Sequence, residues 1–389
     1  MNGQTLMLER NRLHSIDVLR ALTMFLMIFV NDVSSVSNIP KWIEHAEANE
    51  DRLGFADTIF PAFLFIAGLS IPLAVSNRIN KGNSTFSIAF YIFWRAAALI
   101  VMGFFHVNSE SYSSAALLSH SLWMLLVTVA FFLIWLTYPA SLSRTYITIL
   151  RLSGVVLLML MAYFYRGGST EHPEGMQPSW WGILGIIGWA YLVSALLFLL
   201  ARNSIIALAA LLIIFFTINI LSHLNLIPFQ LLLIDDASSV SLMMAGVLAA
   251  SIYQKYKSPL FYFLIAALGC ICLGWVLRPF TGGISKINST PAWVLICTGI
   301  NVIAFCFFIV LVDKKGKAKW FNAIKPAGTS TLTCYLVPYL IYSIFELLHF
   351  WYPSPFNSGI AGILRSFAIS FLIILMVGLM QKRNFSLKL

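Results

Sequence analysis

The sequence predicts an all-α, polytopic transmembrane helix bundle, and three observations lead to this fold class. Of its 389 residues, 59% are hydrophobic and only 10% are charged, whereas soluble domains carry roughly 25% charged residues. The mean hydropathy is +0.85, and the apolar residues gather in runs of about 20, the length of helix that spans a bilayer. An aromatic share of 14% also excludes a disordered chain, which would be poor in apolar residues.

Polar and turn-forming residues divide the apolar runs into twelve predicted helices. We expect about twelve spans, and no fewer than ten, in a single integral-membrane domain over residues 1–389. The first run is too long for the apolar core of a cleavable signal peptide. The predicted helices cover approximately residues 15–37, 57–77, 86–107, 115–138, 145–165, 180–200, 204–222, 238–254, 259–277, 292–312, 328–349 and 360–380.

The Lys and Arg residues between these runs predict the orientation of the helices. Cytoplasmic loops carry an excess of positive charge, and the observed alternation requires the N-terminus to lie inside. Few loop cations then fall outside, namely Lys41, Arg52, Arg166, Arg278 and Lys286. Both termini are therefore predicted to be cytoplasmic, with the inner segments holding Arg10, Arg12, Arg78, Lys81, Arg144, Arg202, Lys255, Lys257, Lys314, Lys315, Lys317, Lys319, Lys325, Lys382, Arg383 and Lys388.

This topology also explains the formal net charge of +10. The basic residues are spread over many cytoplasmic segments instead of forming one patch, so no nucleic-acid partner is predicted. The lipid bilayer is the expected surface partner, in particular for the basic run 314–325. The sequence has no P-loop, no dinucleotide-binding glycine motif and no metal-ligand cluster, so no metal is predicted.

Ionisable residues inside the predicted spans mark candidate functional positions, because charge within a membrane is costly. In the first helix Asp17, Arg20 and Asn31 share one face, and Asp32 follows directly. Asp17 and Asn31 are separated by roughly 21 Å of helix, so this face extends from the cytoplasmic to the outer side. An Asp17–Arg20 pair that only neutralises its own charge is an equally good interpretation. Arg95, in the middle of the third span, must likewise find an anion, a carbonyl or water.

The first outer loop carries a candidate general base. Its sequence KWIEHAEANEDR (residues 41–52) contains His45, and a histidine takes and returns a proton near neutral pH. A lone loop histidine is also commonly a solvated surface residue, and the residues alone leave both interpretations open. Asp57 precedes an apolar run with Pro61 in its first turn, which predicts a helix N-cap. A carboxylate there is also well placed to orient His45.

A second outer loop, TGGISKINSTPAW (residues 281–293), mixes hydrogen-bond donors with an aromatic ring. Lys286, Asn288 and Trp293 of this loop, together with Asp32, are the predicted acceptor-binding residues. An ordinary polar loop with an interfacial tryptophan fits the same pattern.

Three stretches together resemble the heparan-alpha-glucosaminide N-acetyltransferase family of membrane acyltransferases. The first runs from Arg12 to Asn31 and contains RLHSIDVLR and LMIFVN. The second joins His45 to ADTIFPAFLFIAGLSI (residues 56–71), and the third is Trp94-Arg95 leading into GFFHVN (residues 103–108). The motif-bearing part is residues 1–110, and weaker similarity continues along the remaining spans at 180–380. Relative to the sugar-acetylating members, a helix pair at 115–165 looks inserted.

The resemblance implies transfer of acetyl from cytoplasmic acetyl-CoA, as co-substrate, to a glucosamine-type amino sugar or glycan on the far side. His45 matches the family's essential histidine and Asn31 its active-site asparagine, with Asp57 beside them. Arg20 and Arg95, together with Asp17, are the residues expected to meet coenzyme A. The resemblance also implies a bacterial relative, a multi-pass protein of the inner membrane whose acceptor lies in the periplasm.

A sugar permease of the inner membrane is the alternative function. Twelve spans with both termini inside is a common transporter layout, and intramembrane charges suit a translocation path. The absence of a two-half repeat in the sequence weighs against it. The identity of the acceptor and the oligomeric state, monomer or homodimer, are left open by the sequence.

Overall fold

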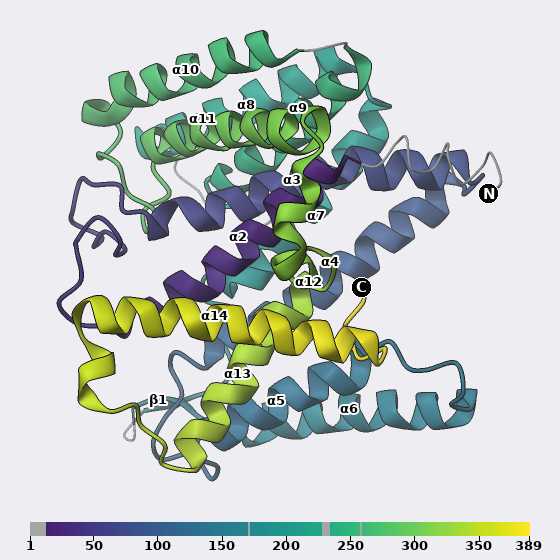
Figure 1. Cartoon of the computed structure of the whole chain (residues 1–389), viewed down its shortest axis with the longest axis vertical. Coiled ribbons are helices and arrows are strands. Elements are labelled where there is room, and N and C mark those ends of the chain that lie inside the picture. Colours follow the sequence, from purple (N-terminus) through teal and green to yellow (C-terminus); the bar gives the residue numbers. More distant parts are fainter. Residues whose placement is uncertain (1–12, 170–171, 228–233, 257–258) are drawn as a thin grey trace.

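The computed structural model describes residues 13–169, 172–227, 234–256 and 259–389, and most of these residues are helical (Figure 1). The only strands in that part are β1 (Gly167–Gly168) and β2 (Pro173–Glu174), which pair antiparallel. The main helices are α2 (His14–Val33), α3 (Ile59–Asn80), α4 (Thr85–Asn108), α5 (His120–Trp135), α6 (Arg144–Phe164), α7 (Gly182–Ala201), α8 (Ile205–His223), α9 (Ser238–Lys255), α10 (Leu260–Leu277), α11 (Pro291–Phe308), α12 (Lys325–Thr329), α13 (Thr331–Leu347) and α14 (Gly359–Lys382).

Each predicted apolar run contains one long helix, with ends that differ by a few residues. Eight helical stretches of the described chain are long and apolar enough to cross a membrane, so this is a multi-pass membrane protein. They are Ala56–Asn80, Thr85–Asn108, Arg144–Phe164, Gly182–Ala201, Ile205–His223, Leu260–Phe280, Pro291–Lys314 and Gly359–Lys382.

A ninth span would combine two helical segments, Lys317–Thr329 and Thr331–Leu347, which are bent by 72° at their junction. The count of twelve spans and the cytoplasmic side of both termini stay predictions. Of the charged residues used for that orientation, Arg10, Arg12 and Lys257 lie outside the described residues.

The first long helix occupies the centre of the bundle. Helix α2 packs against α3, α11, α12, α13 and α14. Along the long axis of the molecule, α8, α10 and α11 lie at one end and α5 and α6 at the other (Figure 1). Helix α2 is therefore surrounded by other helices, among which an intramembrane ion can find partners.

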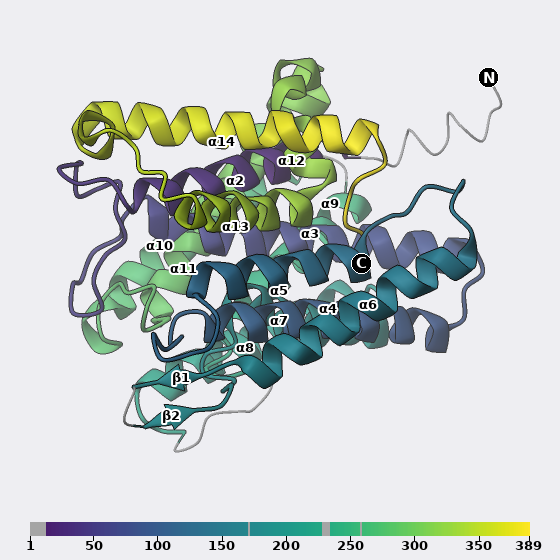
Figure 2. The same ribbon diagram turned by 90° about the horizontal axis from the view of Figure 1, so that it is seen from below.

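The α2–α3 connection and the C-terminal residues lie at opposite ends of the helices. Figures 1 and 2 both show the connection between α2 and α3 at one edge of the bundle and the C-terminus towards the other. The C-terminal residues are held there by backbone hydrogen bonds from Thr137 to Ser386 and from Lys388 to Trp135. A site in the α2–α3 connection is therefore separated from the C-terminal side by the length of the helices.

The predicted helix pair at 115–165 corresponds to α5 and α6, which pack on each other, and α5 also packs on α13. Much of α6 is exposed on the outside of the bundle. Its description as an insertion relative to the family stays a prediction.

Candidate active site

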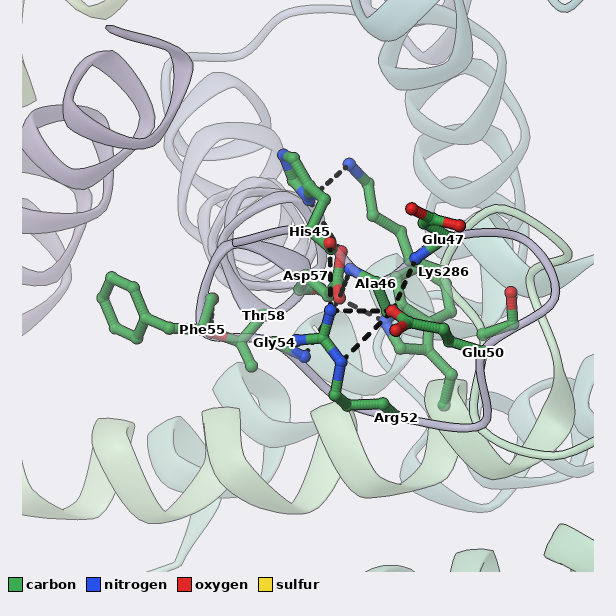
Figure 3. A network of polar contacts seen from close by, with 12 residues as sticks. His45, Ala46, Glu47, Glu50, Arg52, Gly54, Phe55, Asp57, Thr58 and Lys286 are labelled. Atoms are coloured by element: carbon green, nitrogen blue, oxygen red, sulfur yellow. Dashed lines mark hydrogen bonds and ion pairs between the residues drawn. The ribbon is translucent and has the colours of Figure 1, made fainter. Parts of the chain in front are cut away.

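Two short stretches of the α2–α3 connection pair with each other and bring His45 next to Asp57. The N–H of Phe55 donates to the carbonyl of Trp42 at 2.7 Å, and that of Ala56 donates to Ile43 at 3.2 Å. A Cβ at Gly54 would overlap the carbonyl oxygen of Glu44, so the chain crosses here only because residue 54 is glycine. The histidine and the carboxylate, 12 residues apart, thus meet at the start of α3 (Figure 3).

The Asp57 carboxylate is 1% exposed and uses both oxygens. Its Oδ1 lies 2.7 Å from Nδ1 of His45, and its Oδ2 accepts from the backbone N–H groups of Ala46 and Gly54, each at 3.0 Å. The predicted N-cap is wrong, because α3 begins at Ile59 and its cap residue is Thr58. The side chain instead joins the loop to the helix through these three contacts.

The contact with Asp57 determines which nitrogen of His45 carries the proton. An ionised carboxylate only accepts hydrogen bonds, so Nδ1 is the N–H donor and Nε2 keeps its lone pair. The His45 side chain is 35% exposed, and no hydrogen-bond partner of Nε2 is found among the described residues. A histidine in this state has the arrangement of a general base, oriented by a third group.

Trp293 of α11 holds the backbone of Asp57. Its ring is 2% exposed in the first turn of α11, and its indole N–H donates to the carbonyl oxygen of Asp57 at 3.1 Å. The expectation that Trp293 offers a surface for a sugar is therefore corrected: a buried ring whose N–H is already bonded holds Asp57 in place.

The second outer loop approaches the same histidine through Lys286. Its Nζ lies 3.4 Å from Nδ1 of His45. Burial lowers the pKa of the Lys286 ammonium group, against an opposing effect of the Asp57 charge. Asn288 donates from Nδ2 to the carbonyl of Ala48 at 3.0 Å, so its amide connects the two outer loops.

Arg52 braces the His45 loop from the other side (Figure 3). Its guanidinium group bonds Glu50 at 2.8 Å and the carbonyls of Lys41 and His45 at 2.5 and 3.3 Å. The hydrogen bond from Arg52 lowers the pKa of the Glu50 carboxyl. The loop that presents His45 is thus held by charge-assisted hydrogen bonds.

Asp32 and Asn31, adjacent on α2, have different surroundings. The Asp32 carboxylate is buried and is bound by Arg365 at 3.2 Å and by the Tyr342 hydroxyl at 2.6 Å. Its predicted role in acceptor binding is corrected, because both oxygens are already bonded within the bundle. The Asn31 side chain is exposed near the end of the helix, and no contact joins it to His45 in the described structure.

The predicted coenzyme-binding arginines lie in the wall of one cavity of about 370 Å³. Arg20 donates to the Ser70 hydroxyl at 2.6 Å and forms an ion pair with Asp17 at 3.3 Å. Arg95 lies 3.4 Å from the Tyr91 hydroxyl, and its Nε is buried without a hydrogen-bond partner among the described residues. The structure thus brings together Arg20 on α2 and Arg95 on α4, which are far apart in the sequence.

Parts of this cavity were not singled out from the sequence. Nothing in the sequence marks Ser70 as a binding residue, because single serines are common in apolar helices. Hydroxyl residues at a helix start usually serve as caps, but Ser330 at the N-terminus of α13 makes no side-chain cap, and both Ser330 and Thr331 line the cavity. Arg365 carried the usual signal of an ionisable residue within a span, although its partner on α2 became visible only in the fold.

Comparison with known proteins gives two related findings. A segment of 97 residues is 36% identical to the human protein named heparan-alpha-glucosaminide N-acetyltransferase, covering 25% of this chain and 14% of that relative. The mouse protein of the same name is 35% identical over 98 residues, with the same coverage. The matched part is thus about one-seventh of the length of these relatives. A family model described as "Domain of unknown function (DUF5009)" matches residues 12–266, so the chain belongs to the DUF5009 family.

Proposed function

We propose that this chain is a transmembrane acyltransferase that moves acetyl from cytoplasmic acetyl-CoA to a glucosamine-type amino sugar or glycan on the periplasmic side of a bacterial inner membrane. The observation that carries the proposal is the buried Asp57 carboxylate at 2.7 Å from Nδ1 of an accessible histidine. That geometry leaves Nε2 of His45 free to take a proton from an acceptor. The human and mouse relatives are named as N-acetyltransferases, which supports the same reaction class.

The cavity between α2, α4 and α13 suits the phosphate-bearing end of the donor. It contains Arg20 and Arg95 together with the N-terminus of α13 at Ser330 and Thr331, and helix N-termini and guanidinium groups both attract phosphate. The unpartnered Nε of Arg95 is a donor available to a ligand. Met27 also lines the cavity, and Asn31 is one helical turn further along α2, about 6 Å away. An acyl arm following this face would arrive near the outer end of α2.

The chemical step is direct acyl transfer. The acceptor nitrogen or oxygen attacks the thioester carbonyl, and its proton passes to Nε2 of His45. The new bond to the acetyl carbon forms, the carbon–sulfur bond breaks, and the coenzyme leaves as a thiolate that takes up the proton. The amide of Asn31 is the proposed donor to the oxyanion that forms during the attack.

The test of His45 uses purified protein, acetyl-CoA and glucosamine acceptors. His45→Ala should bind acetyl-CoA and keep its thermal stability but lose acetylation by about 100-fold or more, the usual scale for a positioned acid–base group. His172→Ala is the matched control, since His172 is an exposed histidine beside β2. Equal activity in His45→Ala and wild type would contradict the proposal.

The arginines are tested by coenzyme A binding. Arg20→Ala and Arg95→Ala should weaken the affinity, and the lysine variants should restore it only in part, because lysine lacks the bidentate fork. Arg151→Ala, an exposed arginine of α6, should leave the affinity unchanged. Unaltered binding in both alanine variants would exclude this cavity as the donor site.

If wild-type vesicles instead accumulate labelled sugar without coenzyme A and acetylate nothing, the chain is a permease.

A further inference from the structure

Lys286 lies beside His45 but has no role in the proposed acyl transfer. Its ammonium group lies 3.4 Å from Nδ1 of His45, on the same side of the ring as the Asp57 carboxylate. Because Nδ1 carries the proton that Asp57 accepts, Lys286 cannot donate to that nitrogen and acts on the ring through its charge. A cation at this distance disfavours a second positive charge on the imidazole.

The charged residues near His45 belong to three segments: its own loop, η1 (Ala56–Thr58) and the 281–293 loop. The negative charges are Asp57, in η1, which contacts the ring, and Glu44 and Glu47 of the His45 loop. Arg52 contacts the His45 backbone carbonyl at 3.3 Å, and its guanidinium group forms an ion pair with Glu50 at 2.8 Å. Within the described chain, Lys286 is therefore the cation that directly contacts the ring. Without it, the carboxylate of Asp57 would be the charged group in contact with a ring that has to be neutral in order to accept a proton.

Hydrogen bonds between the 41–52 loop and the 281–293 loop fix the position of Lys286. The Asp51 carboxylate accepts from the N–H of Ile284 at 2.7 Å and from Nε of Arg278 at 2.8 Å. Although partial burial opposes it, these two bonds lower the pKa of the Asp51 carboxyl. On the other side of Lys286, Asn288 bonds the carbonyl of Ala48. Both flanks of Lys286 are thus bound to the loop that carries His45.

We propose that Lys286 is a positioning residue, whose charge keeps the His45 imidazole neutral while Asp57 fixes its tautomer. The inference rests on the proposed function, in which His45 is the base. It assigns Lys286 a role other than the acceptor binding expected from its sequence context. The two charged groups on the Nδ1 side of His45 then act in opposite directions, one on orientation and the other on ionisation.

A direct test measures the ionisation of His45 without relying on activity. Diethylpyrocarbonate modifies a histidine in its neutral form and not as imidazolium, and mass spectrometry that locates the adduct on residue 45 gives the extent of modification at each pH. In Lys286→Met the midpoint of modification should rise by about one pH unit or more, because a neighbouring cation has been removed. Lys286→Arg should keep the wild-type midpoint. Lys41→Met removes an exposed cation of the same loop and should leave the midpoint unchanged.

The kinetic test follows the same direction. In Lys286→Met the acidic limb of kcat/KM should move to higher pH together with the modification midpoint, so that the activity lost at a given acidic pH is recovered at alkaline pH. Lys286→Gln, which retains a polar side chain, serves as a second neutral variant if the methionine protein is unstable. A midpoint that stays in place in both variants overturns the inference. If wild-type protein transfers no acetyl, the proposed function is overturned. The modification of His45 can be measured in either case, so the two failures are distinguishable.

Discussion

The Asp57 side chain performs a structural and a chemical task with its two oxygens. Oδ2 closes the turn that leads into α3 by accepting from Ala46 and Gly54, while Oδ1 accepts from His45. Both tasks require an acceptor-only group, because every partner is an N–H donor. An amide side chain has one accepting oxygen and an NH₂ group, so it cannot satisfy all three contacts.

Asp57→Asn is therefore expected to fold but to lose most of its activity. If the amide oxygen stays on the backbone donors, its NH₂ group faces His45 and favours the tautomer with the proton on Nε2. Because Asp57 acts on the reaction only through His45, the loss of kcat should approach that of His45→Ala, about 100-fold or more, without exceeding it. The measurement is kcat for acetyl transfer beside the thermal unfolding midpoint of the same sample. Activity within tenfold of wild type would contradict the orienting role of Asp57.

At the scale of the helices, α2 is attached to its neighbours by polar contacts within the bundle as well as by packing. Asp32 on α2 and Arg365 on α14 form an ion pair whose side chains are only 4% and 8% exposed. Arg365 also bonds Asn357 at 2.5 Å, ahead of α14. The C-terminal end of α2, which carries Asn31, is thereby fixed against α14.

Removing either member of this pair is expected to destabilise the bundle. Asp32→Asn or Arg365→Gln leaves one buried charge unpaired, a change that costs about 3–5 kcal/mol. The double variant should cost clearly less than the sum of the single ones, because neither charge is then present. Denaturant unfolding in detergent measures the three values, with Arg151→Gln as the exposed control. Additive costs would show that the pair is not coupled.

Helices α3 and α9 approach each other through two glycines. A Cβ at Gly68 would overlap the carbonyl of Met243, and one at Gly246 would overlap that of Phe65. Small residues at such positions allow close backbone contact between helices in a membrane.

Gly68→Ala should accordingly lower the unfolding temperature and disturb α3, which begins next to Asp57. Gly269→Ala on α10 is the control, because a Cβ there meets no atom within 4 Å. Overpacking typically costs about 1–3 kcal/mol, so the difference between the two variants should be clear in a thermal scan. Equal unfolding temperatures would mean that α3 and α9 separate easily.

At the scale of the whole molecule, the distribution of charge predicts which end of the bundle faces the cytoplasm. Glu47 lies in the His45 loop and Lys315 in the basic segment between η3 (Ile309–Lys314) and η4 (Lys317–Ile324), and both are exposed. The two positions can therefore report the orientation.

Labelling of intact cells with a membrane-impermeant maleimide checks this orientation. Glu47→Cys should react in intact cells, whereas Lys315→Cys should react only after permeabilisation, because positively charged loops stay inside. The wild-type chain, whose five cysteines lie within helices, gives the background. The reverse pattern would invert the topology and place His45 in the cytoplasm.

The sequence by itself determined the helical membrane fold, the approximate ends of the helices and the residue types of the candidate site. Apolar runs of about 20 residues must be helical in a bilayer, because no water satisfies their backbone groups. The tertiary structure decided the partners that lie on different helices: Asp32 with Arg365, and Arg20 in one cavity with Arg95. These pairings depend on which helix faces meet across long separations in the chain. Hydropathy and spacing describe each helix alone, so they do not specify those contacts.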